Sequence, residues 1–299
     1  MSDSCHDLAR SIGSIAADYR SPEGIAPITS RVDRWISQFD PSERATILRE
    51  MNCLLQRYYW SRKRVQDSIR SFLAREDPFG PDPRASLQGM NFIRIQVEGE
   101  SQLALLALFT YVVYKDYGLI LGLCGGSDIF VYVDDCVYTG NRLRYDVVPW
   151  IQRYAPRGST LIIYHIAAHL EGWQYAKGYV LDAAHQKNVT VKWFHAVEID
   201  NRAVVDGRVE FLWPRRVSGD RNVDAYEERV TRRCSENGWA LKLWRDESVV
   251  QEDFFSSTEA RDIVEGAFLR VGARLVMAAG TPAPSMRPLG FKKLESLSM

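Results

Sequence analysis

The chain has 299 residues, of which 46% are hydrophobic and 25% are charged. This composition supplies enough apolar side chains for a sizeable core and excludes an intrinsically disordered chain. The 38 basic residues balance the 38 acidic residues, so any contact with nucleic acid or a membrane has to come from a local patch rather than from the net charge.

The cysteines and the N-terminus both predict a cytoplasmic protein. The five cysteines are odd in number and scattered, without a Cys-x-x-Cys pair, which argues against a disulfide framework and a zinc site. Residues 1–10 are polar and lack the apolar core of a signal peptide. Since no stretch is long and apolar enough to span a membrane, we expect no membrane contact.

Residues 1 to about 76 have apolar stripes at helical spacing, for example over 32–39, and are expected to be helical. The pattern Asp40-Pro41-Ser42-Glu43 predicts a new helix with Asp40 as its N-cap. Residues 77–83 contain three prolines and one glycine, which cannot form a helix interior or a central strand. We therefore divide the chain into an N-terminal helical region with a Pro-rich linker, 1–83, and an α/β domain, 84–299.

Apolar runs that are typical of strands alternate with helical patterns in the second region. The predicted strands are 92–97, 119–124, 129–133, 160–166 and 189–194. The predicted helices are 103–114, 141–153, 169–187, 225–234 and 259–271. This alternation predicts an α/β fold with a mostly parallel sheet, in which ligands bind beyond the carboxyl ends of the strands.

The run 129–133 leads into two adjacent carboxylates, Asp134 and Asp135, and then into a turn with the sequence Thr139-Gly140-Asn141. Backbone amides in such a turn and at the start of the next helix favour a phosphate. Carboxylates can accept hydrogen bonds from a diol such as the ribose 2′ and 3′ hydroxyls. The pattern favours a sugar-phosphate site. The alternative is an ordinary strand whose aspartates cap the following helix.

A second strand–loop–helix unit places residues 98–101, Glu-Gly-Glu-Ser, before the helical pattern that begins near Leu103. Gly99, Glu100 and Ser101 are candidates for an anion site at this helix start. The two glutamates oppose a direct anion contact unless Mg²⁺ bridges them. The alternative is a loop in which Ser101 caps the helix and the acids favour its positive end.

One basic and aromatic cluster occupies residues 57–64. Its cations are Arg57, Arg62, Lys63 and Arg64, and its rings are Tyr58, Tyr59 and Trp60. Such a mixture can bind phosphates and stack on bases. On the residues alone, a solvated face with one or two core rings is the preferred interpretation.

The strand, acidic pair and turn resemble the 5-phosphoribosyl-1-pyrophosphate (PRPP) motif of type I phosphoribosyltransferases. Asp134 and Asp135 match the acidic pair, while Thr139 and Gly140 match the loop. The resemblance implies that the acidic pair holds the ribose hydroxyls, directly or through Mg²⁺. It also implies that the turn holds the 5′-phosphate and that Gly99, Glu100 and Ser101 form the pyrophosphate loop.

Three positions of the turn depart from the family pattern. Tyr138 stands where Thr or Ser is usual, Asn141 where a second Gly is usual, and Arg142 where the last Thr is usual. Asn141 tolerates a left-handed backbone, and Arg142 can reach a phosphate. The bulk of Tyr138 is the departure that argues against ordinary PRPP geometry.

Several segments in order along the chain resemble a narrower group, the PRTase-CE-like proteins of bacterial conflict systems, which include retron-associated effectors. The matching segments are 32–39, 98–101, 138–141 and the Arg-Pro-Leu-Gly element at 287–290. Many relatives have Lys-Ser where this chain has Glu100-Ser101. Membership implies an antiviral defence effector whose partners, in a retron, are a reverse transcriptase and its RNA–DNA product. The cluster at 57–64 is then the expected contact with these partners.

The sequence thus leaves three hypotheses. The first is an enzyme that acts at ribose C1, a phosphoribosyltransferase or related glycosyltransferase with Mg²⁺. The second is a non-catalytic module that senses a nucleotide or sugar phosphate. The third is an assembly subunit bound to nucleic acid through Arg57, Arg62, Lys63 and Arg64.

Overall fold

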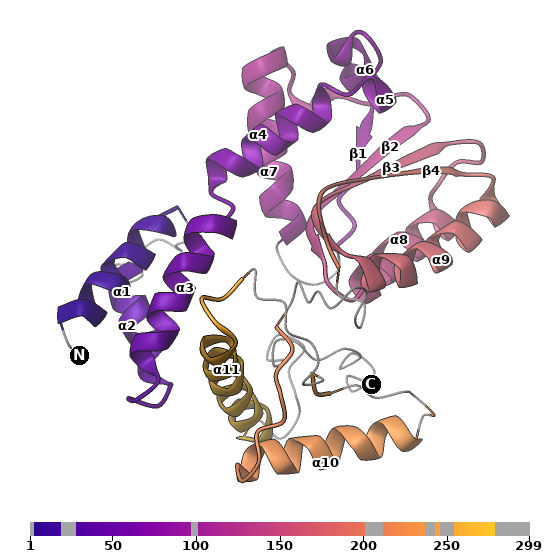
Figure 1. Ribbon diagram of the computed structural model, residues 1–299. Coiled ribbons are helices and arrows are strands. Elements are labelled where there is room, and N and C mark those ends of the chain that lie inside the picture. Colours follow the sequence, from indigo (N-terminus) through magenta and orange to yellow (C-terminus); the bar gives the residue numbers. More distant parts are fainter. Residues whose placement is uncertain are drawn as a thin grey trace. The chain divides into compact units, whose positions relative to one another are not determined.

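The computed structural model describes residues 3–18, 28–96, 101–200, 212–236, 238, 243–245 and 254–278 (Figure 1). The chain divides into two compact units, the first formed by residues 1–61 and 203–299 and the second by residues 62–202. The division at 83/84 that the proline-rich stretch suggested falls inside the second unit. There, residues 76–89 form two short helices that belong to the α/β body.

The second unit is built on a four-stranded, all-parallel sheet in the order β1-β2-β3-β4 (Figure 1). The strands are β1 (Asn91–Phe92), β2 (Ile129–Val137), β3 (Thr160–His169) and β4 (Thr190–Ile199). Its helices are α4 (Arg62–Leu73), α5 (Glu76–Phe79), α6 (Pro83–Gly89), α7 (Ser101–Tyr117), α8 (Asn141–Arg153) and α9 (Leu170–Lys187). The predicted α/β fold with a parallel sheet is confirmed.

Helices cover both faces of this sheet, with α4 and α7 on one side and α8 and α9 on the other (Figure 1). Alternate residues of a strand point to opposite faces. On β3, Tyr164 stacks on Phe72 of α4 at a ring distance of 4.2 Å, whereas its neighbour Ile163 joins the core with Val147 of α8 and Val180 of α9. Because helices bury both faces of the sheet, the sequences of its strands are continuous apolar runs.

Two strand predictions in this unit differ from the structure. The run 119–124 forms a 3₁₀ turn, η1 (Leu121–Leu123), so the predicted strand there is wrong. Ile120 and Leu123 are 54% and 82% exposed, so these apolar side chains lie at the surface and not in a buried strand. Only the first residue of the predicted strand 92–97 is in β1, although the Ile93 amide still donates to the Val131 carbonyl at 3.0 Å.

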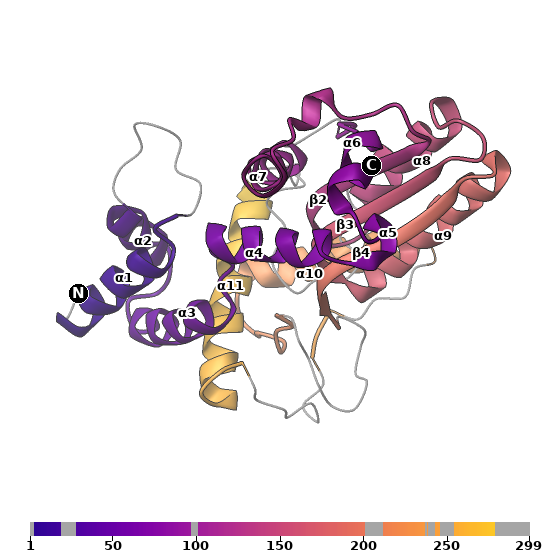
Figure 2. The ribbon, with the colours of Figure 1, turned by 90° about the horizontal axis from the view of Figure 1, so that it is seen from above.

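The described parts of the first unit are mainly helices and come from both ends of the chain. Its helices are α1 (Asp3–Ile15), α2 (Ile28–Ser37), α3 (Arg44–Tyr58), α10 (Arg221–Glu236) and α11 (Thr258–Ala278). Figure 2 shows α1 and α2 beside α3, and Phe268 of α11 packs on Phe39 at a ring distance of 5.3 Å. No helix of the described ranges has the length and apolarity needed to cross a membrane.

The predicted N-cap at Asp40 lies three residues too early. Asp40 Oδ1 accepts hydrogen bonds from the amide of Ser42 at 2.9 Å and from its hydroxyl. These bonds form a local turn, and α3 begins only at Arg44 with Glu43 as its N-cap residue. The Asp-Pro-Ser-Glu pattern therefore marks a turn before the helix, because short polar side chains also stabilise turns.

A buried cluster of charged side chains ties two irregular segments of the first unit to α11. The guanidinium of Arg245 donates to Asp262 at 2.6 Å and to Glu265 at 3.2 Å. Glu265 also accepts from Arg261 and from the backbone amide of Trp213, each at 2.9 Å. Because Arg245, Arg261 and Glu265 are buried, removing one of them leaves an uncompensated charge, which costs far more than breaking a surface ion pair.

We expect Glu265→Ala to destabilise the first unit by about 3–5 kcal/mol, since it leaves two buried guanidiniums without this carboxylate. Glu259→Ala on the same helix is the control, because Glu259 is exposed and its loss should change stability little. Urea unfolding of the two variants measures the difference. Equal midpoints would contradict a stabilising role for the cluster.

Candidate functional site

The two aspartates at the end of β2 occupy different environments. Both belong to β2, which continues to Val137 instead of ending before them, so their side chains point to opposite faces of the sheet. Asp134 is 4% exposed, whereas Asp135 is exposed. The sequence predicted one paired carboxylate site. The structure instead gives one buried carboxylate and one that is accessible to a ligand.

Three donors surround the Asp134 carboxylate. Its Oδ1 accepts from the Ser101 hydroxyl at 2.7 Å and from the Asp135 amide at 2.9 Å. Its Oδ2 accepts from the Tyr132 hydroxyl at 3.1 Å. Burial raises the pKa of Asp134 to about 6, and the hydrogen bond from Ser101 opposes this shift. Asp134 thus links β2 to the first residue of α7.

Two glutamines, Gln96 and Gln102, join the segments before and after the first predicted loop by hydrogen bonds. Gln102 Oε1 accepts from the amides of Ile95 and Gln96, both at 2.9 Å, and the Gln102 amide donates to Gln96 Oε1 at 3.1 Å. Gln96 Nε2 donates to the Ser101 hydroxyl at 2.9 Å. Ser101 is thereby brought to Asp134. The other two predicted loop residues, Gly99 and Glu100, lie outside the described residues.

The turn after β2 is pressed against the first turn of α9. A Cβ on Gly172 would lie 2.2 Å from the Tyr138 carbonyl oxygen and 2.7 Å from the Thr139 Cα. A Cβ on Gly140 would lie 2.0 Å from the Gly172 carbonyl oxygen, and Gly140 has a left-handed φ of 81°. Both positions need glycine, so this contact between two backbones fixes the shape of the turn.

Helix α8 begins at this turn without a side-chain cap. Its N-cap residue is Gly140, whereas Asp82 caps α6 through the Ala85 amide and Asp220 caps α10 through the Val223 amide, both at 3.1 Å. The first amides of a helix have no partner within the helix and carry its positive end. This arrangement suits an anion beside the turn.

The comparison with protein families decides the assignment at this point. The PRTase-CE family matches residues 32–299. The chain belongs to the PRTase-CE family. No curated protein and no solved structure matched it. Family membership supports a phosphoribosyltransferase-like α/β fold, in agreement with the parallel sheet and with the turn after β2.

The remaining predicted residues of the PRTase-CE turn lie around the start of α8. Thr139 and Asn141 are half-buried and Arg142 is exposed. The Tyr138 ring is 63% exposed and lies 5.4 Å from the His169 ring. The bulk of Tyr138 is therefore at the surface, and its main chain still shapes the turn through Gly172.

Two further groups near the turn are electrically neutral at physiological pH. Burial raises the pKa of the Cys136 thiol to about 12, so this cysteine is a packed thiol rather than a reactive thiolate. Burial lowers the pKa of His165, which pairs with Asp134 across the β2–β3 ladder, to about 3. Neither group supplies charge to a ligand.

The turn offers Mg²⁺ one accessible carboxylate. Asp135 Oδ1 accepts from the Cys136 amide at 2.7 Å, which leaves Oδ2 for a ligand or an ion. Mg²⁺ is commonly held by one or two carboxylates together with substrate phosphates and water. Asp135 fits this pattern, whereas the donors on Asp134 occupy both of its oxygens. Within the described residues, no group of three or more His, Cys, Asp or Glu side chains forms a metal site.

The basic cluster at 57–64 straddles the division between the two units. Arg57 lies in α3 of the first unit, whereas Arg62, Lys63 and Arg64 open α4 of the second. Lys63 pairs with Asp67 at 2.7 Å. A contact between this cluster and nucleic acid remains a prediction.

We expect Gly172→Ala to displace the turn, because the added Cβ meets backbone atoms that cannot rotate away. The cost should be on the order of 3 kcal/mol. The matched control is Gly178→Ala in the same helix, where no atom lies within 4 Å of the added Cβ. That change should stabilise α9 by about 0.5–1 kcal/mol. Thermal unfolding measures both, and a neutral Gly172→Ala would refute the backbone contact.

Asp134→Asn should stabilise the protein at neutral pH. The raised pKa of Asp134, about 6 against an ordinary 3.8, means that the folded chain keeps this proton to higher pH than the unfolded chain. Its contribution to stability is therefore present below pH 4 and lost as the pH rises through about 6. Asparagine carries no charge, its Oδ1 can keep the bonds from Ser101 and the Asp135 amide, and its Nδ2 can donate to the Tyr132 hydroxyl in place of the bond that Oδ2 accepts.

The measurement is the difference in free energy of unfolding between Asp134→Asn and the native chain at several pH values. The difference should grow in favour of the variant between pH 4 and pH 7. A difference that does not change with pH would show that Asp134 is not buried as a costly carboxylate.

Proposed function

We propose that this PRTase-CE protein binds PRPP, or a nucleotide that presents ribose 5-phosphate, at the turn 138–142 and acts at ribose C1. The observation that carries the proposal is the uncapped start of α8, held by the Gly140–Gly172 contact and preceded along the chain by the exposed Asp135. The uncapped helix start can bind a phosphate, and the Asp135 carboxylate can accept hydrogen bonds from a sugar. Family membership supports the phosphoribosyltransferase-like part.

In this proposal the turn holds the 5′-phosphate. The amides of residues 138–141 and the Thr139 hydroxyl donate to the phosphate oxygens, and the exposed Arg142 adds a cation. Asp135 accepts from the ribose hydroxyls or holds Mg²⁺, which would neutralise the charge of the pyrophosphate. Asp134 acts as a positioning residue, because it orients Ser101 and the end of the first loop.

The chemistry at C1 follows from charge and position. When the bond from C1 to the leaving group breaks, its electrons go with that group, and positive charge develops on C1 and the ring oxygen. A fixed carboxylate near the ribose stabilises this oxocarbenium-like transition state. Holding the phosphate and the hydroxyls aligns the sugar with an acceptor.

The same site also suits a non-catalytic sensor of nucleotides or sugar phosphates. The observation that favours it is the exposed Tyr138, which replaces a hydroxyl-bearing residue in the turn. A role in antiviral defence of the retron type belongs to the same proposal. Its partners would be a reverse transcriptase and an RNA–DNA product, contacted through Arg57, Arg62, Lys63 and Arg64.

A thermal shift with PRPP and Mg²⁺ tests ligand binding at the turn. The native chain should gain stability with rising PRPP, and Asp135→Asn should lose most of this gain because it removes the accessible carboxylate. Asp182→Asn, at an exposed position of α9, should behave like the native chain. No shift in the native chain, or an equal shift in all three proteins, would contradict the proposal.

Release of pyrophosphate from PRPP, measured after a positive shift, separates the two forms of the proposal. Release that Asp135→Asn abolishes supports an enzyme. A shift without release, in the presence of candidate bases as acceptors, supports the sensor.

A further inference from the structure

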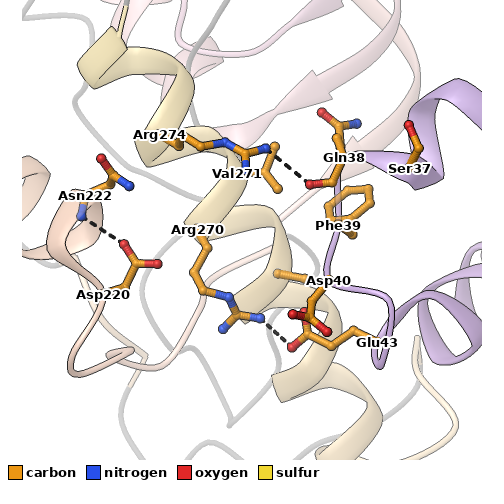
Figure 3. A pocket seen from close by; sticks show the side chains of 11 residues that line it. Ser37, Gln38, Phe39, Asp40, Glu43, Asp220, Asn222, Arg270, Val271 and Arg274 are labelled. Atoms are coloured by element: carbon orange, nitrogen blue, oxygen red, sulfur yellow. Dashed lines mark hydrogen bonds and ion pairs between the residues drawn. The ribbon is translucent and has the colours of Figure 1, made fainter.

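A cavity of about 380 Å³ lies within the first unit, apart from the turn after β2 (Figure 3). Its walls are the α2–α3 connection, the start of α10 and one face of α11. The N-terminal and C-terminal segments of the chain therefore both contribute to it. Its volume is in the range of small-molecule sites, roughly 300–1,000 Å³.

The carboxylates around this cavity are already engaged by neighbouring groups. Asp40 accepts from the Ser42 amide at 2.9 Å, and this hydrogen bonding lowers the pKa of Asp40. Asp220 accepts from the Asn222 amide at 2.9 Å and so helps to cap α10, while Glu43 pairs with Arg270. These contacts hold the carboxylates in place. Each carboxylate uses one oxygen for them, and its second oxygen makes no hydrogen bond within the described residues.

The groups left to recognise a ligand are a guanidinium and two amides. Arg274 is exposed, and one of its five N–H donors reaches the Gln38 carbonyl at 3.2 Å. The side-chain amides of Gln38 and Asn222 make no hydrogen bond within the part of the chain that the structure describes. Figure 3 shows Arg270 and Arg274 between the side that holds Asn222 and the side that holds Gln38.

This set of groups matches the parts of one kind of molecule. Arg270 and Arg274, one helical turn apart, can hold a phosphate with charge-assisted hydrogen bonds. A side-chain amide presents a donor next to an acceptor, which is the pattern that reads the edge of a nucleobase. The small apolar side chains of Ala267 and Val271 also line the cavity and offer an apolar surface to a flat ring.

We propose that this cavity binds a mononucleotide. Arg274, with Arg270, holds the phosphate, and the amides of Gln38 and Asn222 read the base. The remaining oxygens of Asp40 and Asp220 accept from the ribose hydroxyls. This site is independent of the proposed turn site, because the two lie in different units and share no residue.

The test uses the full chain with Asp135→Asn, which removes the accessible carboxylate of the turn. Isothermal titration with AMP, GMP, CMP and UMP should show one site for at least one of them. In the same background, Arg274→Ala should weaken that binding tenfold or more, since it removes a charged donor. Arg232→Ala, at an exposed position of α10, is the matched control and should not change affinity.

Two further measurements test whether the cavity recognises the base. Asn222→Ala should reduce the preference among the four mononucleotides, and ribose 5-phosphate should bind at least tenfold more weakly than the preferred mononucleotide. The proposal is overturned if no mononucleotide binds, if the arginine variant matches its control, or if ribose 5-phosphate binds equally well. Unchanged melting temperatures of the variants show that any loss of binding is not a loss of folding.

Discussion

The Asp134 carboxylate is the interaction on which the second unit's functional end depends. A carboxylate that is buried at the end of a strand is costly unless donors surround it. Here the donors come from the same strand, from the next residue and from the first residue of α7. The hydrogen bonds that satisfy the buried Asp134 carboxylate therefore fix the position of Ser101, the first residue of α7. The glutamine pair continues this network to residue 95.

Adjacent residues with the same side chain acquire different tasks because a strand alternates its faces. The buried Asp134 has its oxygens filled by donors, whereas the exposed Asp135 keeps one oxygen accessible. The turn between them and the helix is set by main-chain contact with Gly172, not by its own side chains. This explains how the PRTase-CE turn accommodates an exposed tyrosine. The shape of the turn depends on the glycines and not on the side chain at position 138.

The periodicity of the sequence predicted the parallel sheet and the helix from Asn141, because the alternation of strand and helix patterns is visible in the sequence itself. It did not predict the role of Gly172. A glycine inside a helical pattern signals only a loss of helix propensity, and its partner in the turn is distant in sequence. The bond from Ser101 to Asp134 was missed for the same reason. The predicted strand 119–124 was wrong for a different reason. Its apolar residues are partly exposed, and Leu121–Leu123 form a 3₁₀ turn.

The first unit is discontinuous, because residues 62–202 are inserted between its two parts. Its stability therefore requires segments from both ends of the chain to associate, through the aromatic contact of Phe39 with Phe268 and through the pair of Glu43 with Arg270. A ligand in the proposed cavity would touch both segments, Gln38 from one and Arg274 from the other. It would stabilise their association by mass action, and the gain in free energy would grow with the logarithm of its concentration over its dissociation constant. By thermodynamic linkage, any coupling between the two sites must be reciprocal. A mononucleotide that alters affinity for PRPP must have its own affinity altered by the same factor, so regulation by nucleotide level is measurable from either site.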